Sequence, residues 1–278
     1  MKLIKIFNLL VRKAIFFTLF SAFLLVIFPV TLFVLSILRI GNFRLNNKLL
    51  LHLFRFWFYA SGVKVTGEGK DNLPGDTAYI LASNHQSALD LASVMCALNV
   101  PFRPVIAEGF FRAPVPSLNY VIRKCGCLPI PAGPSSNFKK RIDEIVKVLS
   151  EGESILIFPE GITTQEGELR RFKWGVSQIA LNSGRPVVPV AIKGTNRILP
   201  SFFTLFRNIL AKQPTRLGLL FVFIKILFYM FYGFSPGNAK VAVGKPMIFS
   251  GYKEASLDVF RDIAEKLENE VRVLLQRL

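Results

Sequence analysis

Acidic residues and cysteines are both scarce in this sequence. No Asp or Glu occurs before Glu68, so the first 67 residues are purely basic and apolar, a composition suited to anionic lipid surfaces. Of the three cysteines, Cys96 stands alone, and Cys125 with Cys127 lacks a second ligand pair nearby. This pattern argues against a disulfide framework and against a metal site. We interpret the cysteines as reduced thiols, which is consistent with a catalytic domain on the cytosolic side.

The charge balance is strongly positive. The chain has 35 Lys plus Arg against 18 Asp plus Glu, a formal charge of +17 that suits nucleic acid, anionic lipid or an acidic partner protein. Half of the residues are hydrophobic and 27 are Phe, so we expect part of this apolar surface to face lipid. No basic and aromatic nucleic-acid recognition module occurs. Membrane lipids are therefore the predicted partners, and nucleic acid is not.

Residues 14–38 form a 25-residue run without a charge, long enough to cross the hydrocarbon core as a helix. The run is too long for a cleaved signal peptide, and no small-x-small cleavage site follows it. Pro29 lies inside it and is expected to kink or break a helix there. Basic residues flank both ends, so the positive-inside rule gives no orientation. The sequence predicts an anchor over residues 1–62, either a membrane-spanning helix or a re-entrant hairpin.

From Thr77 onward, short β-branched runs alternate with helical patterns. The runs 77–83, 153–160 and 186–194 have the character of strands, and a helix is expected near 88–98. This alternation predicts an α/β domain over residues 63–278, with a largely parallel sheet flanked by helices. Apolar positions repeat at helical spacing between 254 and 278, which predicts an amphipathic helix packed on the domain.

Residues 199–234 interrupt this pattern with an apolar segment that carries basic residues and no acids. Lys225 lies in mid-run and costs about 2.5 to 3.5 kcal/mol on insertion scales, which disfavours a simple span. We predict two apolar helices on the membrane face, with the cations reaching lipid headgroups. A buried hairpin of the domain core is the alternative.

His85 and Asp90 are the strongest candidates for catalysis. Five positions along a helix turn by about 500°, so these side chains cannot stack on one helix face. They meet only if His85 lies in the loop before a helix and Asp90 lies in the first turns of that helix. Asp90 would then accept a hydrogen bond from one ring nitrogen and leave the other as a general base. Such a base would deprotonate a hydroxyl for attack on a thioester.

Four motifs in this order resemble those of the glycerophospholipid acyltransferases, whose best-known branch is the 1-acylglycerol-3-phosphate acyltransferases. They are Asn84-His85-Gln86-Ser87-Ala88-Leu89-Asp90, Phe158-Pro159-Glu160-Gly161, Phe172-Lys173-x-Gly175 and Val188-Pro189-Val190, within about residues 63–247. The resemblance implies direct acyl transfer from acyl-CoA or acyl carrier protein to a lysolipid hydroxyl, with no bound metal or cofactor. A Gly-x-Ser-x-Gly elbow and a zinc-spaced His/Cys set are both absent, which agrees with this reaction.

The resemblance also implies roles for individual residues. His85 is expected to be the base, Asp90 its orienting partner, and Glu160 and Gly161 are expected to shape the acceptor site. The remaining predicted substrate-binding residues are Asn84, Ser87, Thr163 and Lys173.

Two departures from the family pattern concern the acceptor phosphate. Where the family usually has Glu-Gly-Thr-Arg, this chain has Thr163 in place of the arginine. Where the family usually has Ile-Asp-Arg, this chain has Ile130-Pro131-Ala132, so Ala132 stands in place of the second arginine. Family members use both arginines to hold the phosphate, and a bidentate guanidinium is hard to replace. The default acceptor is 1-acylglycerol-3-phosphate, and lysophosphatidylethanolamine or a lyso-aminolipid is the alternative. A non-catalytic membrane scaffold with the same fold is the alternative from another class. The possible replacement cations are Arg123, Lys124, Arg170, Arg171 and Lys173.

Overall fold

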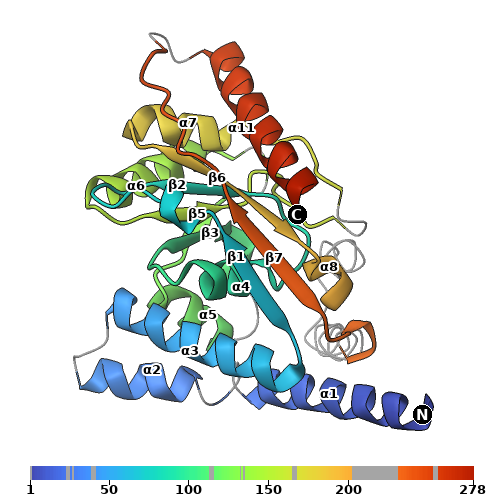
Figure 1. The fold of residues 1–278 in the computed structure, drawn as a ribbon. Coiled ribbons are helices and arrows are strands. Elements are labelled where there is room, and N and C mark those ends of the chain that lie inside the picture. Colours follow the sequence, from blue (N-terminus) through green and yellow to red (C-terminus); the bar gives the residue numbers. More distant parts are fainter. Residues whose placement is uncertain are drawn as a thin grey trace.

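The chain folds around one seven-stranded sheet with helices on both faces (Figure 1). The structure, a computed structural model, describes residues 2–22, 26, 28–38, 42–112, 116–131, 133, 135–164, 168–201, 231–252 and 256–278. The strands lie in the order β1-β7-β6-β2-β5-β3-β4, and every neighbouring pair is parallel except β6 with β7. Their bounds are β1 Lys64–Glu68, β2 Ile80–Ser83, β3 Arg103–Ala107, β4 Leu128–Ile130, β5 Ile155–Ile157, β6 Val187–Lys193 and β7 Asn238–Val243. The predicted α/β class with a largely parallel sheet is confirmed.

The central strands β2, β5 and β6 are short apolar runs covered on both faces. Successive side chains alternate between the two faces, so Ile80 packs into one core cluster and Leu81 into the other. Register pairs Ile80 with Ile155 on one side and with Val187 on the other. Because all three strands run parallel, their carboxyl ends share one edge of the sheet. The chain segments that follow these ends are therefore brought together.

Two groups of helices cover the sheet. The first group packs on one face of the sheet and forms one core cluster with it. This group consists of α6 Phe138–Ser150, α7 Gly175–Ser183 and α11 Leu257–Arg277. The second group packs on the opposite face and forms the other core cluster. This group consists of α3 Phe43–Ser61, α4 Asp90–Leu98 and α5 Pro116–Lys124. Shorter elements are η2 Lys70–Asn72, η3 Glu108–Arg112 and α8 Thr195–Ile198.

Helix α11 is the amphipathic helix expected near the C-terminus. The Ser256 hydroxyl accepts a hydrogen bond from the Val259 N–H and caps its first turn. Its buried stripe consists of Ile263, Ala264, Leu267, Val271 and Leu274. Leu257, the first apolar residue of this helix, is 46% exposed, because the buried stripe begins further along the helix.

The charge-free run 14–38 is divided between α1 Lys2–Ala22 and α2 Phe28–Ile37, with Pro29 in the first turn of α2. A proline is tolerated there because the first N–H groups of a helix have no partner within it. Among the residues with described positions, no helix combines the length and the apolar character needed to cross a membrane. The predicted insertion 199–234 lies outside the described residues over 202–230.

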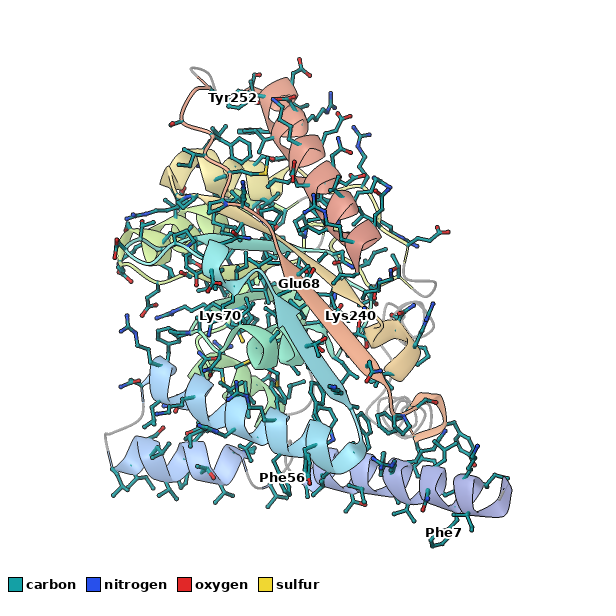
Figure 2. All side chains as sticks on the ribbon, in the orientation of Figure 1. Phe7, Phe56, Glu68, Lys70, Lys240 and Tyr252 are labelled. Carbon is teal, nitrogen blue, oxygen red and sulfur yellow. The ribbon has the colours of Figure 1, made fainter. Side chains whose placement is uncertain are left out.

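Helices α1, α2 and α3 lie together along one side of the molecule (Figure 1). The Trp57 indole N–H donates to the carbonyl of Phe16 at 3.0 Å, and the Phe16 ring stacks on Phe234. The first contact joins α1 to α3, and the second joins α1 to the segment before β7. Phe7 and Phe56 point outward from this side (Figure 2).

Candidate active site

His85 and Asp90 meet as the sequence requires. His85 lies in the loop after β2, and Asp90 is the first residue of α4. The His85 Nδ1 and the Asp90 Oδ2 are 2.8 Å apart. The Asp90 side chain is fully buried, whereas the His85 side chain is 23% exposed. The pair is therefore anchored on one side and open on the other.

Several donors fix the Asp90 carboxylate. Its Oδ2 accepts the backbone N–H groups of Gln86 at 2.6 Å and Ser87 at 2.9 Å, in addition to the His85 ring. Its Oδ1 accepts the Thr195 hydroxyl at 2.5 Å. Burying a carboxylate costs several kcal/mol unless such bonds satisfy its oxygens. The N-terminal end of α4 also favours a negative charge at Asp90.

The His85 ring is held in place by stacking as well as by hydrogen bonding. It lies against the Phe158 ring, with centroids 4.1 Å apart and planes 17° apart. Donation from Nδ1 to Asp90 leaves the lone pair on Nε2. Within the described part of the chain, Nε2 makes no hydrogen bond. The arrangement suits a general base that takes a proton from an incoming hydroxyl.

Glu160 connects the His85 loop to the segment before α7. Its Oε1 accepts the His85 backbone N–H at 2.7 Å, and its Oε2 accepts the Arg170 backbone N–H at 3.1 Å. Burial raises the pKa of Glu160 to about 7, and the Asp90 charge adds to this effect. The two N–H donors act in the opposite direction. Through its two hydrogen bonds, Glu160 holds the backbone of His85 next to the segment that contains Arg170.

Gly161 and Lys173 lie against each other beside this carboxylate. Gly161 has a φ of +73°, and an added Cβ would lie 2.5 Å from the Lys173 Nζ. The left-handed conformation favours glycine at this position, whereas the Lys173 side chain is flexible and could move away from an added Cβ. Lys173 itself is exposed, which leaves its ammonium next to the site.

Asn84 and Ser87 tie this loop to other parts of the domain. The Asn84 amide donates to the Ile192 carbonyl at 2.9 Å and accepts the Ile192 N–H at 2.7 Å. The Ser87 hydroxyl donates to the Leu199 carbonyl at 2.6 Å. Both side chains are buried, so these bonds position the catalytic loop. Their contact with substrate stays a prediction.

Comparisons with known proteins agree with this geometry. The sequence model of the family described as Acyltransferase matches residues 64–193, which include every predicted site residue. The chain is 31% identical over 139 residues to the chloroplastic 1-acyl-sn-glycerol-3-phosphate acyltransferase LPAT1 of Arabidopsis thaliana. It is 28% identical over 153 residues to the 1-acyl-sn-glycerol-3-phosphate acyltransferase of Borreliella burgdorferi. Residues 64–193, which contain both His85 and Asp90, are therefore similar to the acyltransferase family.

The acyltransferase relatives are matched only in part. The alignments cover 50% of this chain and 38% of the Arabidopsis protein, and 55% of this chain and 60% of the Borreliella protein. The crystal structure of the 1-acyl-sn-glycerophosphate (LPA) acyltransferase PlsC from Thermotoga maritima superposes with a TM-score of 0.68. That match covers 99% of this chain and 98% of PlsC at 23% identity, and it shows that the two share a fold.

Thr163 occupies the position where acyltransferases of the phosphatidic-acid-forming branch usually have an arginine. It is buried, and its hydroxyl forms a hydrogen bond with the Ser201 hydroxyl. It therefore supplies no charge to an acceptor phosphate. Ala132, at the second departure, lies outside the described residues.

The replacement cations fall into two groups. Arg123 lies over the Phe111 ring and Lys124 over the Tyr120 ring, at the end of α5. Arg170 and Arg171 are exposed, and the Arg170 backbone is bonded to Glu160. Together with Lys173, this second group lies on the segment that Glu160 joins to His85.

Sequence reasoning missed Thr195 and the stacking role of Phe158. Thr195 follows β6, whose carboxyl end lies beside that of β2, so the shared edge of a parallel sheet was the available signal. Phe158 stands in a quoted motif, but no sequence pattern reports which ring it will stack on. No cluster of three metal-ligating side chains occurs among the residues that the structure describes.

Proposed function

We propose that this protein is an acyltransferase that moves a fatty acyl group from a thioester to the free hydroxyl of a lysolipid. The observation that carries the proposal is the bond between the buried Asp90 and the Nδ1 of His85, whose Nε2 is left available. A non-catalytic scaffold of the same fold has no need of an oriented base. Acyl-CoA or acyl carrier protein is the proposed co-substrate, and no cofactor is required.

The reaction follows from the orientation of the pair. His85 Nε2 takes the proton of the acceptor hydroxyl as its oxygen attacks the thioester carbonyl carbon. Asp90 stabilises the imidazolium that forms. When the tetrahedral intermediate collapses, the C–S bond breaks, and the imidazolium returns the proton to the leaving thiolate. The products are an ester and a free thiol, and the enzyme is unchanged.

The default acceptor is 1-acyl-sn-glycerol-3-phosphate, which would give phosphatidic acid. The names of the Arabidopsis and Borreliella relatives support this choice. The second candidate is a lysolipid with a capped headgroup, such as lysophosphatidylethanolamine or a lyso-aminolipid. The buried Thr163 favours it, because no arginine at that position can hold a phosphate monoester. Lys173 is the proposed cation near the acceptor in either case.

We also propose that helices α1, α2 and α3 rest on a membrane, with the catalytic domain on the cytoplasmic side. The support is a set of exposed apolar side chains on α1, α2 and α3, including Ile4, Phe7, Phe33, Ile37 and Phe56. Figure 2 shows Phe7 and Phe56 pointing outward. Exposed apolar patches of this kind mark interaction surfaces. The absence of carboxylates before Glu68 adds an attraction to anionic headgroups.

His85→Ala tests the proposed chemistry, and His52→Ala is the matched control. His52 is the other histidine of the two in the chain, and it is exposed on α3. Purified protein is given acyl-CoA or acyl carrier protein thioester with a panel of lysolipids, and ester formation is measured. We expect His85→Ala to abolish turnover with folding intact and His52→Ala to retain it. His85→Ala at near wild-type rates under saturating thioester would refute the mechanism. A lipid extract of cells lacking the protein would identify the acceptor as the lysolipid that accumulates.

A further inference from the structure

The two oxygens of the buried Asp90 carboxylate are held unequally. Its Oδ2 accepts hydrogen bonds from the His85 Nδ1 and from the backbone N–H groups of Gln86 and Ser87. Its Oδ1 has one donor within the described part of the chain, the Thr195 hydroxyl at 2.5 Å. Asp90 and Thr195 are both fully buried, so bulk water does not reach this bond. The Oδ1 end of the carboxylate therefore depends on one hydroxyl.

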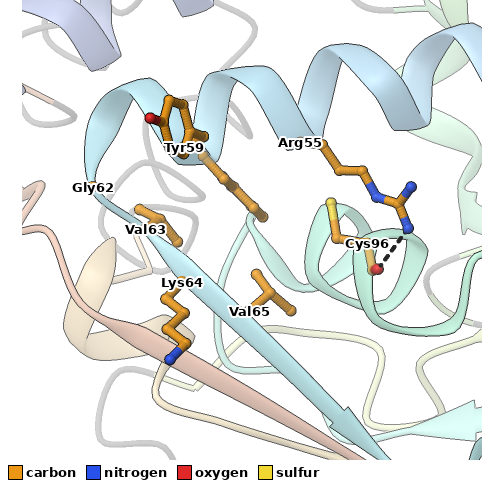
Figure 3. A pocket seen from close by; sticks show the side chains of 8 residues that line it. Arg55, Tyr59, Gly62, Val63, Lys64, Val65 and Cys96 are labelled. Atoms are coloured by element: carbon orange, nitrogen blue, oxygen red, sulfur yellow. Dashed lines mark hydrogen bonds between the residues drawn. The ribbon is translucent and has the colours of Figure 1, made fainter.

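Helix α4, which begins at Asp90, is fixed along its length by neighbouring elements. Near its far end, the Arg55 guanidinium donates to the Cys96 carbonyl at 3.4 Å, beside a cavity between α3, β1 and α4 (Figure 3). Between the two ends, Val94 and Met95 are buried in the core. The freedom that remains at Asp90 is rotation of the carboxylate about χ2, a torsion with broad and roughly two-fold preferences. A donor at each oxygen fixes this rotation more tightly than donors at one oxygen.

The path of the chain after β6 places Thr195 beside the carboxylate. Strand β6 lies next to β2, and their register pairs Val190 with Ser83, the last residue of β2. Gly194 then turns the chain into α8 with a φ of +95°, and an added Cβ would lie 2.5 Å from the Asn238 carbonyl oxygen. The left-handed backbone and the close carbonyl both favour glycine there. Thr195 is the first residue of α8, and its β-branched side chain is restricted at χ1, so its hydroxyl has a defined position.

The segment around α8 holds the catalytic loop at a second point. Leu199 directly follows α8, and its carbonyl accepts the Ser87 hydroxyl at 2.6 Å. Ile198 and Leu199 also pack with Leu89 in one buried cluster. Thr195 therefore donates to the first residue of α4, and Leu199 accepts from the loop before it. Two bonds in opposite directions fix the separation between α8 and the catalytic loop.

We propose that Thr195 is a positioning residue for His85 and acts through Asp90. Its hydroxyl occupies Oδ1, so Oδ2 stays directed at the His85 Nδ1, the proton stays on that nitrogen, and Nε2 keeps its lone pair. Without the hydroxyl, the buried Oδ1 would lack a donor and would turn toward the N–H groups of Gln86 and Ser87. The proposal rests on the acyl transfer proposed above, whereas the tautomer of the ring is measured without it.

Thr195→Val and Thr195→Ser test this role, and Ser177→Ala is the matched control. Valine has nearly the shape of threonine without the hydroxyl, whereas serine retains the hydroxyl. The buried Ser177 hydroxyl donates to the Phe260 carbonyl at 2.7 Å, from α7 on the face of the sheet opposite α4. Circular dichroism at the assay temperature shows whether each variant is folded. Thr195→Ala, which differs from Thr195→Ser by one oxygen atom, repeats the comparison if the valine variant does not fold.

The first readout is the tautomer of the His85 ring, which needs no substrate. The chain has two histidines, so in a His52→Ala background the ¹⁵N signals of labelled histidine come from His85 alone. These signals report which ring nitrogen carries the proton. We expect the proton on Nδ1 in the parent, in Thr195→Ser and in Ser177→Ala, and a mixture of tautomers in Thr195→Val. The Nδ1–H tautomer alone in Thr195→Val would overturn the proposal.

The second readout is the steady-state kinetics of ester formation. We expect Thr195→Val to lower kcat on the order of tenfold to a hundredfold, the usual worth of one hydrogen bond to a charged group, with KM for the thioester nearly unchanged. Thr195→Ser and Ser177→Ala should stay within about threefold of wild type. In an Asp90→Asn background, Thr195→Val should cost less than about twofold more, because the hydroxyl acts through that carboxylate.

Two kinetic outcomes would overturn the proposal. One is an equal loss of kcat in Thr195→Val and Ser177→Ala, which would indicate general destabilisation. The other is a pair of losses that multiply in the double variant with Asp90→Asn, which would mean that Thr195 acts independently of the carboxylate. A wild type that forms no ester would refute the proposed function instead, and the tautomer measurement would still decide the role of Thr195.

Discussion

The catalytic edge of the sheet and the N-terminal helical side solve opposite physical problems. At the catalytic edge, Asp90 is fully buried and its oxygens accept bonds from side chains and backbone of the chain itself. On the helical side, large apolar side chains of α1 and α3 are exposed, and the rings of Phe7 and Phe56 face outward. The first region is complete within the protein. The second region exposes the apolar side chains that the proposed contact with a lipid surface requires.

This difference in burial and hydrogen bonding suits the catalytic edge to chemistry and the helical side to attachment. Chemistry requires groups held within a fraction of an ångström, which a closed hydrogen-bond network on rigid strands provides. Attachment to a fluid surface requires exposed apolar area and unpaired cations, which cost little when the surface is present. We therefore expect substitutions at the catalytic edge to affect turnover and stability, and substitutions on the helical side to affect attachment.

The largest effect is expected from Asp90→Asn. The amide keeps the shape and can turn its oxygen to the N–H groups and its NH₂ to the Thr195 hydroxyl, but the His85 ring would lose its charged partner. Loss of a carboxylate that orients a catalytic histidine lowers kcat by roughly 10³-fold to 10⁴-fold. Steady-state kinetics should show this loss in kcat at nearly constant KM for the thioester. Asp71→Asn, at an exposed position in η2, is the control and should behave as wild type. An Asp90→Asn enzyme within tenfold of wild type would remove the distinction between the two regions.

Glu160→Gln should alter the pH dependence of stability. The pKa of Glu160 is raised from 4.5 to about 7, so the folded protein retains a proton that the unfolded chain releases. This contribution to the free energy of unfolding is fully present below about pH 4.5 and is lost as the pH rises through about 7. The full change is at most about 3 kcal/mol. Urea unfolding between about pH 5 and about pH 8 should show wild type losing more stability than Glu160→Gln.

One outcome of this unfolding experiment would contradict the prediction for Glu160. If both proteins showed parallel pH profiles, Glu160 would not titrate in this range, and its carboxylate would be ionised throughout. Glu153→Gln provides a comparison, because this carboxylate lies in the turn before β5 and contacts Arg103. Glu153→Gln should lose as much unfolding free energy as wild type between about pH 5 and about pH 8.

Phe33→Ser with Ile37→Ser should weaken attachment and spare the chemistry. These α2 side chains are 58% and 63% exposed, so their removal deprives no described core of packing. Full burial of such a side chain in an apolar phase is worth roughly 1.5 to 3 kcal/mol, and partial burial in a membrane less. We expect vesicle partitioning to fall on the order of tenfold, with kcat unchanged for detergent-dispersed acceptor. Unchanged partitioning would show that this side is not a membrane surface.

Sequence patterns within single strands and helices predicted more of this structure than could be predicted for contacts between residues far apart in the sequence. The strands around 80, 156 and 190 followed from short apolar runs, and the His85 geometry followed from the angle between positions of one helix. The bond from Thr195 to Asp90 joins residues 105 positions apart, and the Asn84 bonds to Ile192 join residues 108 apart. Both depend on β2 lying beside β6, which periodicity alone does not reveal. The buried partner of Thr163 likewise required the fold.

The smallest expected effect concerns acceptor choice and tests the catalytic edge where it departs from the family. A bidentate arginine would favour a phosphate monoester by about 1.5 to 3 kcal/mol, or roughly tenfold to a hundredfold. Thr163 offers only a buried hydroxyl, so the ratio of kcat/KM for 1-acylglycerol-3-phosphate over lysophosphatidylethanolamine or a lyso-aminolipid should be below about tenfold, or reversed. A strong preference for the monophosphate would mean that Lys173 or the Arg170-Arg171 pair holds the phosphate instead. Alanine substitution of these three residues separates the cases, because only a phosphate-holding cation loses activity selectively with the monophosphate acceptor.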